Sequence, residues 1–193
     1  NRFRRWQFQR LVPAVLRQDP TYPKVQWNAF GATGNAPGSW DPVEAKFYPL
    51  VDTIAPLGFE EVMIDVGWWQ AGEPTSDAVD WPSGMRKAAD HAHAKGMRFG
   101  LYWSDNLDMA RPDARKQRAA RIRRLFEEHR ADSWRSDSTS GEVLGASFAA
   151  TRGFYDLIDG LAREIPNFQW ENCSGGGRIK DFGAMRRSVK IFN

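Results

Sequence analysis

The sequence has few of the residues that build disulfide scaffolds or metal centres. It contains one cysteine and three histidines, His91, His93 and His129, among 193 residues. A single cysteine excludes an internal disulfide framework. The histidines are scattered and we expect no carboxylate to partner them, which argues against a zinc site. No apolar run is long enough to cross a membrane, and no signal peptide stands at Asn1. The sequence therefore predicts no metal site and no membrane partner.

The sequence also lacks a large excess of either sign of charge, because it has 27 Lys+Arg and 24 Asp+Glu and a net charge of only +3. One alternative is nucleic-acid binding through the basic side chains of segment 111–129, since basic helices can follow phosphates. These side chains are Arg111, Arg115, Lys116, Arg118, Arg121, Arg123 and Arg124. Acidic residues dilute the segment and an apolar stripe runs along it. We therefore favour an outer barrel helix with a solvated face, and no nucleic-acid partner.

What is present is a regular alternation of short apolar segments and helical patterns, with 41% hydrophobic residues and nine tryptophans. The predicted strands are 25–29, 61–66, 97–103, a segment ending at 137, 167–171 and 189–192. The predicted helices are 41–57, 84–94, 111–129, 147–164 and 183–187. On the helix 147–164, we expect Phe148, Phe154 and Leu157 to share an apolar face.

Six strands that alternate with helices predict an α/β fold with a parallel sheet. We expect an incomplete (β/α)8 TIM barrel with about six of its eight βα units, because the full barrel needs about 250 residues. A doubly wound open sheet is the alternative, although no strand precedes a G-x-G-x-x-G run. We expect residues 1–23 to be a lead-in from an upstream domain and residues 24–193 to be the partial barrel.

Polar and aromatic residues recur at the predicted carboxyl ends of the strands, which meet on one rim in a barrel. They are Asn28, Asp65, Trp68, Trp103, Asp105, Asp137, Glu171, Cys173 and Arg178. Each has an ordinary structural explanation, such as a helix cap or a cover over the barrel. Their periodic recurrence favours a pocket. A carboxylate pair and aromatic walls suit sugar chemistry, so we expect Asp137 to be the nucleophile of a retaining glycoside hydrolase.

Four segments resemble one enzyme family. They are Asn28-Ala29-Phe30, Ile64–Trp69, Gly96–Tyr102 and Trp170–Arg178. They resemble, in this order, the catalytic barrel of the α-galactosidases (melibiases) of glycoside hydrolase family 36, and more distantly family 27. The resemblance covers about Trp27 to Asn193, and its most specific part is the Glu-x-Cys-Ser-Gly-Gly-Gly-Arg stretch. It implies a retaining, exo-acting hydrolase that uses no cofactor and takes a carbohydrate substrate.

The resemblance also implies roles for single residues. Asp137 matches the nucleophile of the family's Lys-x-Asp motif, and Arg135 stands at the lysine that binds sugar hydroxyls. Asp65 matches the first Asp of Asp-Asp-Gly-Trp, which grips the non-reducing galactose, and Trp68 is the adjacent wall. The remaining substrate-binding residues that we expect are Trp103 at the barrel mouth and, in the loop after the fifth strand, Cys173 and Arg178.

Three departures from the family pattern bear on specificity. Val66 replaces the second Asp and removes an acceptor for a sugar hydroxyl. Arg135 offers a planar fork where the family has a compact ammonium. Ser104-Asp105-Asn106 stands where the family has Glu-Pro-Glu. The resemblance places the acid/base Asp just past the sixth strand, so we expect it beyond Asn193 and expect a polypeptide that ends at Asn193 to be inactive.

Two other functions on the same barrel remain open. One is a transglycosylase similar to raffinose synthases, which passes through the same covalent intermediate. The other is a carbohydrate-binding barrel without catalysis, which Val66 and Arg135 favour. The sequence leaves open the compartment, the preferred sugar and whether the full-length protein is a homo-oligomer.

Overall fold

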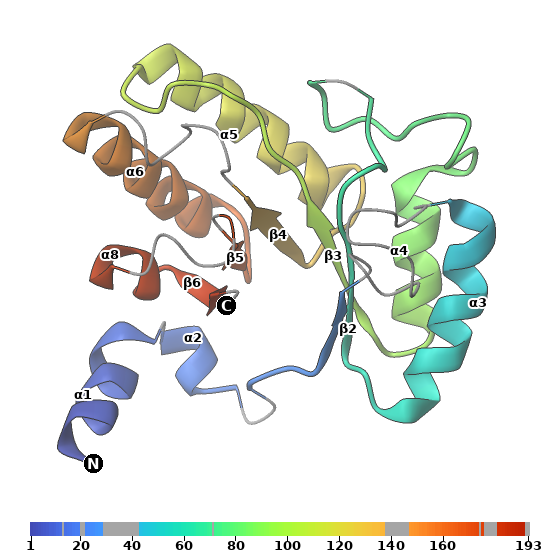
Figure 1. The fold of residues 1–193 in the computed structure, drawn as a ribbon, viewed down its shortest axis with the longest axis horizontal. Helices are drawn as coiled ribbons and strands as arrows, with labels where there is room; N and C mark the ends of the chain where they lie inside the picture. Colours follow the sequence, from blue (N-terminus) through green and yellow to red (C-terminus); the bar gives the residue numbers. More distant parts are fainter. Residues whose placement is uncertain are drawn as a thin grey trace. The chain divides into compact units, whose positions relative to one another are not determined.

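The computed structural model describes residues 1–12, 14–19, 22–28, 43–70, 72–137, 147–173, 175 and 181–191. Within these ranges the predicted alternation of strands and helices is confirmed (Figure 1). The strands are β1 Gln26–Asn28, β2 Glu61–Ile64, β3 Arg98–Tyr102, β4 Ser133–Ser136, β5 Trp170–Asn172 and β6 Ser188–Ile191. The helices are α1 Arg2–Leu11, α2 Ala14–Arg17, α3 Glu44–Ile54, η1 Ala55–Leu57, α4 Gly84–Ala94, α5 Pro112–Glu127, α6 Phe148–Glu164 and α8 Phe182–Met185.

The six strands form one sheet in the order β1-β2-β3-β4-β5-β6, which is their order along the chain. The pairs β1–β2, β2–β3 and β5–β6 are parallel. In a doubly wound sheet the strand order reverses at a switch point, whereas a (β/α)8 barrel adds each new strand on the same side. The sequential order confirms the incomplete TIM barrel and excludes the doubly wound alternative.

Local chemistry explains where several helices begin and end. Gly58 closes η1 in the left-handed region at φ 89°, and Gly96 does so at φ 77° just after α4. Glycine adopts this conformation without a steric penalty. Ser147 caps α6 by accepting a hydrogen bond from the Ala150 N–H at 3.1 Å. Helix α3 begins at Glu44 rather than at the predicted residue 41, and residues 41–42 lie outside the described residues.

The chain divides into two compact units, which are described separately. One comprises Asn1–Tyr22, Ser104–Arg123 and Arg135–Asn193, and the other comprises Pro23–Trp103 and Arg124–Trp134. Below they are called the Asp137 unit and the Asp65 unit. The predicted boundary between a lead-in and a barrel at residues 23 and 24 stays a prediction.

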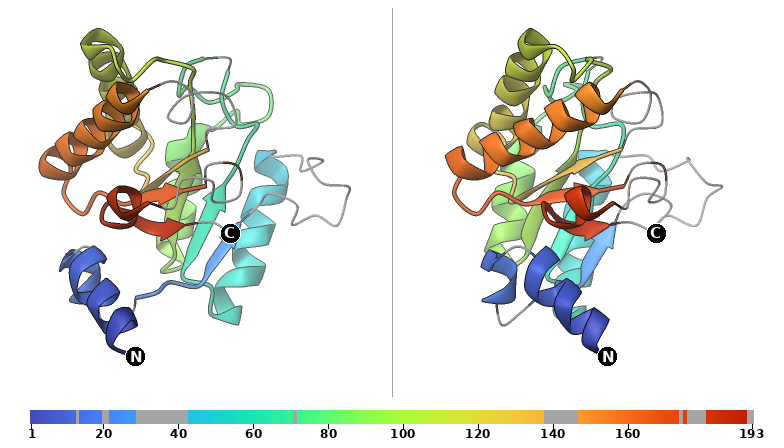
Figure 2. Two further views of the ribbon diagram at one scale, coloured as in Figure 1. Left: turned by 60° about the vertical axis from the view of Figure 1, so that its left-hand side comes forward. Right: turned by 90° about the vertical axis from the view of Figure 1, so that its left-hand side faces the viewer.

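In the Asp65 unit, α3 and α4 lie side by side along β2 and β3 (Figures 1 and 2). Phe47 of α3 is the centre of an aromatic cluster, with its ring centroid 5.5 Å from that of Trp81 and 6.0 Å from that of Phe99. Val62 of β2 and Met85 of α4 are also fully buried in this unit. Burial of these side chains stabilises the unit by about 1.5–3 kcal/mol for each large one.

In the Asp137 unit, α6 buries Phe154, Leu157 and Leu161, and α8 lies beside β6 (Figure 2). The Phe154 ring packs edge-on against Trp170 at 5.3 Å. The predicted apolar face of this helix was wrong at Phe148, which is 81% exposed. Phe148 is the first residue of the helix and precedes its packed stretch. No helix among the described residues is long and apolar enough to cross a membrane.

Candidate active site

Asp137 lies directly after β4 and is held by hydrogen bonds from two other segments of its unit. The Ser104 hydroxyl, two residues after β3, donates to the Asp137 carbonyl oxygen at 3.1 Å. The Ser104 Oγ also accepts a hydrogen bond from the Asp137 N–H at 3.3 Å. The Gly175 N–H donates to Oδ1 of the Asp137 carboxylate at 2.5 Å. The side chain is therefore half-buried and oriented at the carboxyl end of its strand.

The ends of β4 and β5 are joined beside Asp137. The Cys173 N–H donates to the Ser136 carbonyl oxygen at 3.0 Å, and the Trp170 indole N–H donates to the Ser136 Oγ at 2.8 Å. The structure thus brings Asp137 and Cys173 to neighbouring strand ends, as the barrel rim requires. The Cys173 thiol is free and the residue is buried. Its contact with a sugar stays a prediction.

Arg135 and Glu171 form a buried ion pair between β4 and β5. The Arg135 Nε lies 2.9 Å from a Glu171 carboxylate oxygen, and the two side chains are 3% and 2% exposed. Sequence reasoning placed Glu171 on the rim and gave Arg135 a role toward sugar hydroxyls from the resemblance, without linking the two residues. The pair neutralises two charges that would be costly to bury singly. The role of Arg135 toward sugar hydroxyls stays a prediction.

The Asp65 unit holds the other predicted substrate residues that are described. Asp65 is buried just after β2, and its Oδ1 accepts a hydrogen bond from the Val66 N–H at 3.0 Å. The Trp68 indole donates to the Tyr102 carbonyl oxygen at 2.6 Å, and Trp68 and Trp103 are both fully buried. Val66 is 38% exposed. Arg178 lies outside the described residues, so its role stays a prediction.

A buried cluster of charged side chains follows β3, and the sequence did not reveal how these side chains pair. Asp105 accepts hydrogen bonds from Arg118 Nε at 2.7 Å and from Arg121 Nη1 at 3.3 Å. The Arg118 Nη2 also donates to the Asp105 carbonyl oxygen at 2.7 Å. The Asp105 and Arg118 side chains are only 6% and 1% exposed. The signal in the sequence was the position of Asp105 just after a strand, but its partners 13 and 16 residues away could not be predicted from that position.

The basic segment that suggested nucleic-acid binding uses its arginines within the fold. Arg123 pairs with Glu164 at 2.5 Å, and Arg124 pairs with Glu128 at 3.0 Å. Arg115 donates to the Met109 carbonyl oxygen at 2.7 Å. Arg118 and Arg121 bind Asp105 as described above. Since phosphate binding requires accessible cations, the arginines held in these contacts are poorly placed to bind a nucleic acid, although Arg111 and Lys116 of the segment are exposed.

The histidines have partners that the sequence did not reveal. His91 Nε2 lies 3.0 Å from an Asp52 oxygen and His93 Nε2 lies 2.8 Å from an Asp132 oxygen, so the expectation of no carboxylate partner was wrong for both. The third, His129, donates to the Pro74 carbonyl oxygen at 2.7 Å. No group of three or more potential metal ligands occurs within the part of the chain that the structure describes.

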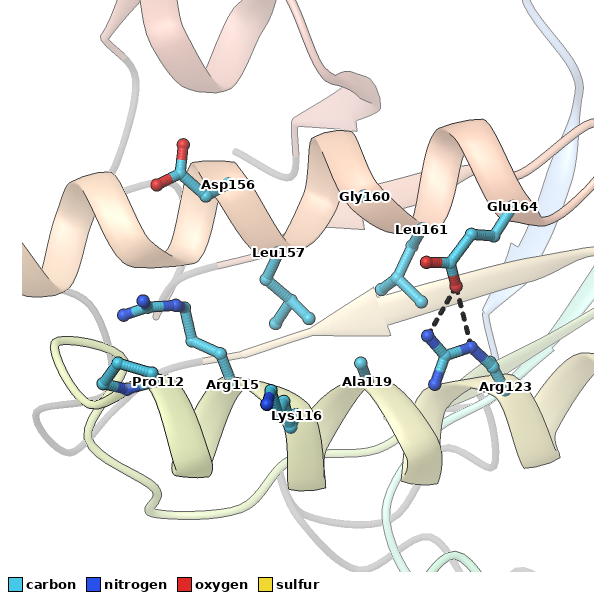
Figure 3. Close-up of a pocket in the computed structure, with 10 residues that line it drawn as sticks. All are labelled: Pro112, Arg115, Lys116, Ala119, Arg123, Asp156, Leu157, Gly160, Leu161 and Glu164. Atoms are coloured by element: carbon cyan, nitrogen blue, oxygen red, sulfur yellow. Dashed lines mark hydrogen bonds and ion pairs between the residues drawn. The ribbon is translucent and has the colours of Figure 1, made fainter.

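A groove of about 330 Å³ lies between α5 and α6 (Figure 3). Leu157 and Leu161 point from α6 toward α5, while Asp156 points away, and Arg123 and Glu164 bridge the two helices. None of the predicted site residues lines this groove. It is therefore separate from the residues around Asp137.

Comparison with known proteins confirms the resemblance to α-galactosidases. No family model matches the chain. An α-galactosidase of Lactobacillus acidophilus is 26% identical over 201 residues, which cover 77% of this chain and 28% of that protein. An α-galactosidase of Escherichia coli is 26% identical over 190 residues, which cover 74% of this chain and 27% of that protein. The chain thus spans less than a third of the length of these curated relatives.

Solved structures confirm the fold. The α-galactosidase from Lactobacillus brevis has a TM-score of 0.75 at 22% identity, covering 88% of this chain and 29% of that one. A family 36 α-galactosidase from Geobacillus stearothermophilus, in complex with stachyose, has a TM-score of 0.78 at 19% identity, covering 95% of this chain and 32% of that one. These matches show that the chain has the strand and helix arrangement of family 36 barrel domains.

Proposed function

We propose that this chain supplies the nucleophile of a retaining, exo-acting hydrolase of α-galactosides. The observation that carries the proposal is the Asp137 carboxylate, which stands at the carboxyl end of β4 with Oδ1 bound by the Gly175 N–H at 2.5 Å. Active sites of barrel enzymes lie at this end of the strands. The relatives named α-galactosidases supply the class of substrate.

The proposed reaction has two steps. Asp137 Oδ2 forms a bond to the anomeric carbon while the bond from that carbon to the leaving oxygen breaks. The leaving oxygen takes a proton from a second carboxylic acid, which the resemblance places beyond Asn193. Water then gives a proton to that carboxylate and attacks the anomeric carbon, which releases the sugar and regenerates Asp137. No cofactor takes part.

Most of the other predicted residues bind the sugar in this proposal. Asp65 accepts hydrogen bonds from the hydroxyls of the non-reducing sugar, and Val66 removes one acceptor that the family has. The predicted walls Trp68 and Trp103 are fully buried, so a direct contact of either with the sugar is not part of this proposal. Since a site that lacks one hydrogen-bond partner discriminates less between hydroxyl arrangements, we expect a wider choice of sugar than in the family. Cys173, Arg178 and Arg135 complete the predicted binding set.

The test uses the protein at its full natural length and α-configured mechanism-based probes of several sugars. Intact mass and peptide mapping are expected to find a glycosyl adduct on Asp137, and the probe that reacts identifies the sugar. Asp137→Asn is expected to form no adduct and to lower kcat by at least about 10³-fold, because an amide is a poor nucleophile.

Asp156→Asn is the matched control, since Asp156 is exposed on α6 and points away from α5 (Figure 3). It is expected to react like the wild type. An adduct on another carboxylate would contradict the assignment of Asp137, and the absence of an adduct with every probe would favour the binding barrel. Products formed in the presence of a sugar acceptor distinguish hydrolysis from transglycosylation.

A further inference from the structure

Ser104 is the residue through which the loop after β3 holds Asp137. Its single hydroxyl contacts both backbone groups of Asp137, donating to the carbonyl oxygen at 3.1 Å and accepting from the N–H at 3.3 Å. Asp137 lies one residue past the end of β4, where the regular strand hydrogen bonds stop. Buried backbone groups need such partners. The serine thus replaces strand pairing at the position where the carboxylate leaves the sheet.

Ser104 is itself fixed by the next residue. Asp105 is bound by Arg118 and Arg121 of α5, through its carboxylate and, in the case of Arg118, through its carbonyl oxygen as well. Its Oδ1 also accepts from the Leu107 N–H at 3.1 Å, which shapes the turn that follows. Charge-assisted hydrogen bonds in a site this buried are short and strongly oriented. A small displacement of Ser104 would therefore have to break buried ion pairs.

The side chain of Asp137 is fixed from the opposite side. The Gly175 N–H holds Oδ1, and the Ser136 carbonyl oxygen just before Asp137 accepts from the Cys173 N–H at 3.0 Å. Ser104 therefore restrains the backbone of the nucleophile, and the segment after β5 restrains the Oδ1 oxygen of its carboxylate. Together they leave little freedom to the direction in which Oδ2 points.

We propose that Ser104 is a positioning residue for the nucleophile, and that Asp105, Arg118 and Arg121 form the anchor that keeps Ser104 in place. The proposal rests on the proposed function of Asp137. Ser104 does not touch the substrate in this account and acts only through Asp137. Because attack requires the reacting atoms within about 3–3.5 Å of each other in a fixed orientation, a displaced carboxylate slows the chemical step and leaves substrate binding nearly unchanged.

The test measures the rate of adduct formation on Asp137, and kcat and KM, for the protein at its full natural length. Ser104→Ala is expected to lower kcat and the labelling rate by about 10- to 100-fold with KM within about 3-fold of the wild type, as expected for loss of orientation. Ser104→Thr keeps the hydroxyl and is expected to restore most of the rate. Ser104→Cys, a weaker hydrogen-bonding group, is expected to lie between them.

Ser188→Ala is the matched control. Ser188 is a buried serine of the Asp137 unit, whereas Ser104 is half-buried, and its hydroxyl likewise donates to a backbone carbonyl oxygen, that of Ala184 at 2.9 Å, at the amino end of β6. It is expected to label and turn over at the wild-type rate. Equal losses in Ser104→Ala and Ser188→Ala, or no recovery in Ser104→Thr, would overturn the positioning role in favour of a general packing effect.

Failure of the two proposals is distinguishable. If the wild type forms no adduct on Asp137, the proposed function fails and the role of Ser104 falls with it. If the wild type labels at Asp137 and Ser104→Ala labels at the same rate, only the positioning role is overturned. If Ser104→Ala does not fold, Ser104→Thr and Ser104→Cys decide, because a positioning role requires the cysteine variant to be the slower of the two.

Discussion

At the scale of single residues, the ion pair of Arg135 and Glu171 gives the sharpest prediction of stability. Their side chains are 3% and 2% exposed. Glu171→Gln leaves the Arg135 charge buried without its counter-charge, which is expected to lower the free energy of unfolding by about 3–5 kcal/mol. Urea denaturation followed by tryptophan fluorescence measures this change.

A matched variant and a double variant test the cause. Glu128→Gln removes a carboxylate from the solvated pair with Arg124, whose side chains are 34% and 51% exposed, and is expected to cost less than about 0.5 kcal/mol. Replacing Arg135 by Met together with Glu171 by Leu removes both buried charges and is expected to recover most of the loss. A double variant as unstable as Glu171→Gln would show that packing, and not charge, is decisive.

The sequence could predict which residues stand at the strand ends but not how they pair. Asp137 and Cys173 were expected at neighbouring ends because parallel strands place their carboxyl ends together, and the Cys173 N–H does bond the carbonyl oxygen of Ser136, the residue before Asp137. The hydrogen bond between Ser104 and Asp137 spans 33 residues and the ion pair of Arg135 and Glu171 spans 36, so no local sequence pattern predicts either contact. Pairing depends on side-chain direction within the folded rim, which sequence spacing does not contain.

At the scale of elements, the contact of α6 with the segment before α5 depends on Gly153. A Cβ atom at this position would lie 2.0 Å from the Met109 carbonyl oxygen and 2.9 Å from an Arg115 nitrogen. A backbone atom cannot move aside as a flexible side chain can. Gly153→Ala is therefore expected to lower the free energy of unfolding by about 1–3 kcal/mol, as overpacking does, measured by urea denaturation.

Gly160, on the same helix, is the control. A Cβ there would have the Arg163 Nη2 as its nearest neighbour at 4.0 Å. Alanine is a better helix former than glycine by about 0.5–1 kcal/mol, so Gly160→Ala is expected to raise the free energy of unfolding. Opposite signs for the two variants are required. If both substitutions stabilise the protein, the close approach of Gly153 to Met109 is refuted.

Element boundaries were predictable where backbone chemistry is local. Gly58 and Gly96 end their helices through left-handed conformations, and Ser147 caps α6. The prediction for Phe148 was wrong because periodicity assigns a face to every residue of a helix, whereas only residues within the packed length are covered. The extent of packing depends on neighbouring elements and not on the helix itself.

At the scale of the whole molecule, the alternation of strands and helices fixed the class of fold but not its winding. A singly wound barrel and a doubly wound sheet use the same βα units, and each crossover is right-handed in both. They differ in the side on which each new strand is added, which no local signal encodes. The order β1 to β6 without reversal decides for the barrel.

The response of stability to pH is the last prediction, and it depends on His129. Burial lowers the pKa of the His129 imidazole and outweighs the Pro74 carbonyl, which favours the charged form. In the unfolded chain a histidine has a pKa of about 6.5. Below this pH the unfolded state binds a proton that the folded state resists. The contribution to stability is therefore fully present above pH 6.5 and is lost as the pH falls toward and through the folded pKa.

His129→Gln isolates this proton, because glutamine can still donate to the Pro74 carbonyl oxygen, which His129 contacts at 2.7 Å, but does not titrate in this range. Urea denaturation of both proteins at several pH values between about 5 and 8 gives the difference in their free energies of unfolding. The wild type is expected to lose more stability than the variant on acidification, with the difference developing below about pH 6.5. Since acid titrates many other groups equally in both proteins, only the difference reports on His129. A difference that stays constant across the range would show that the imidazole is as easily protonated in the fold as in the unfolded chain.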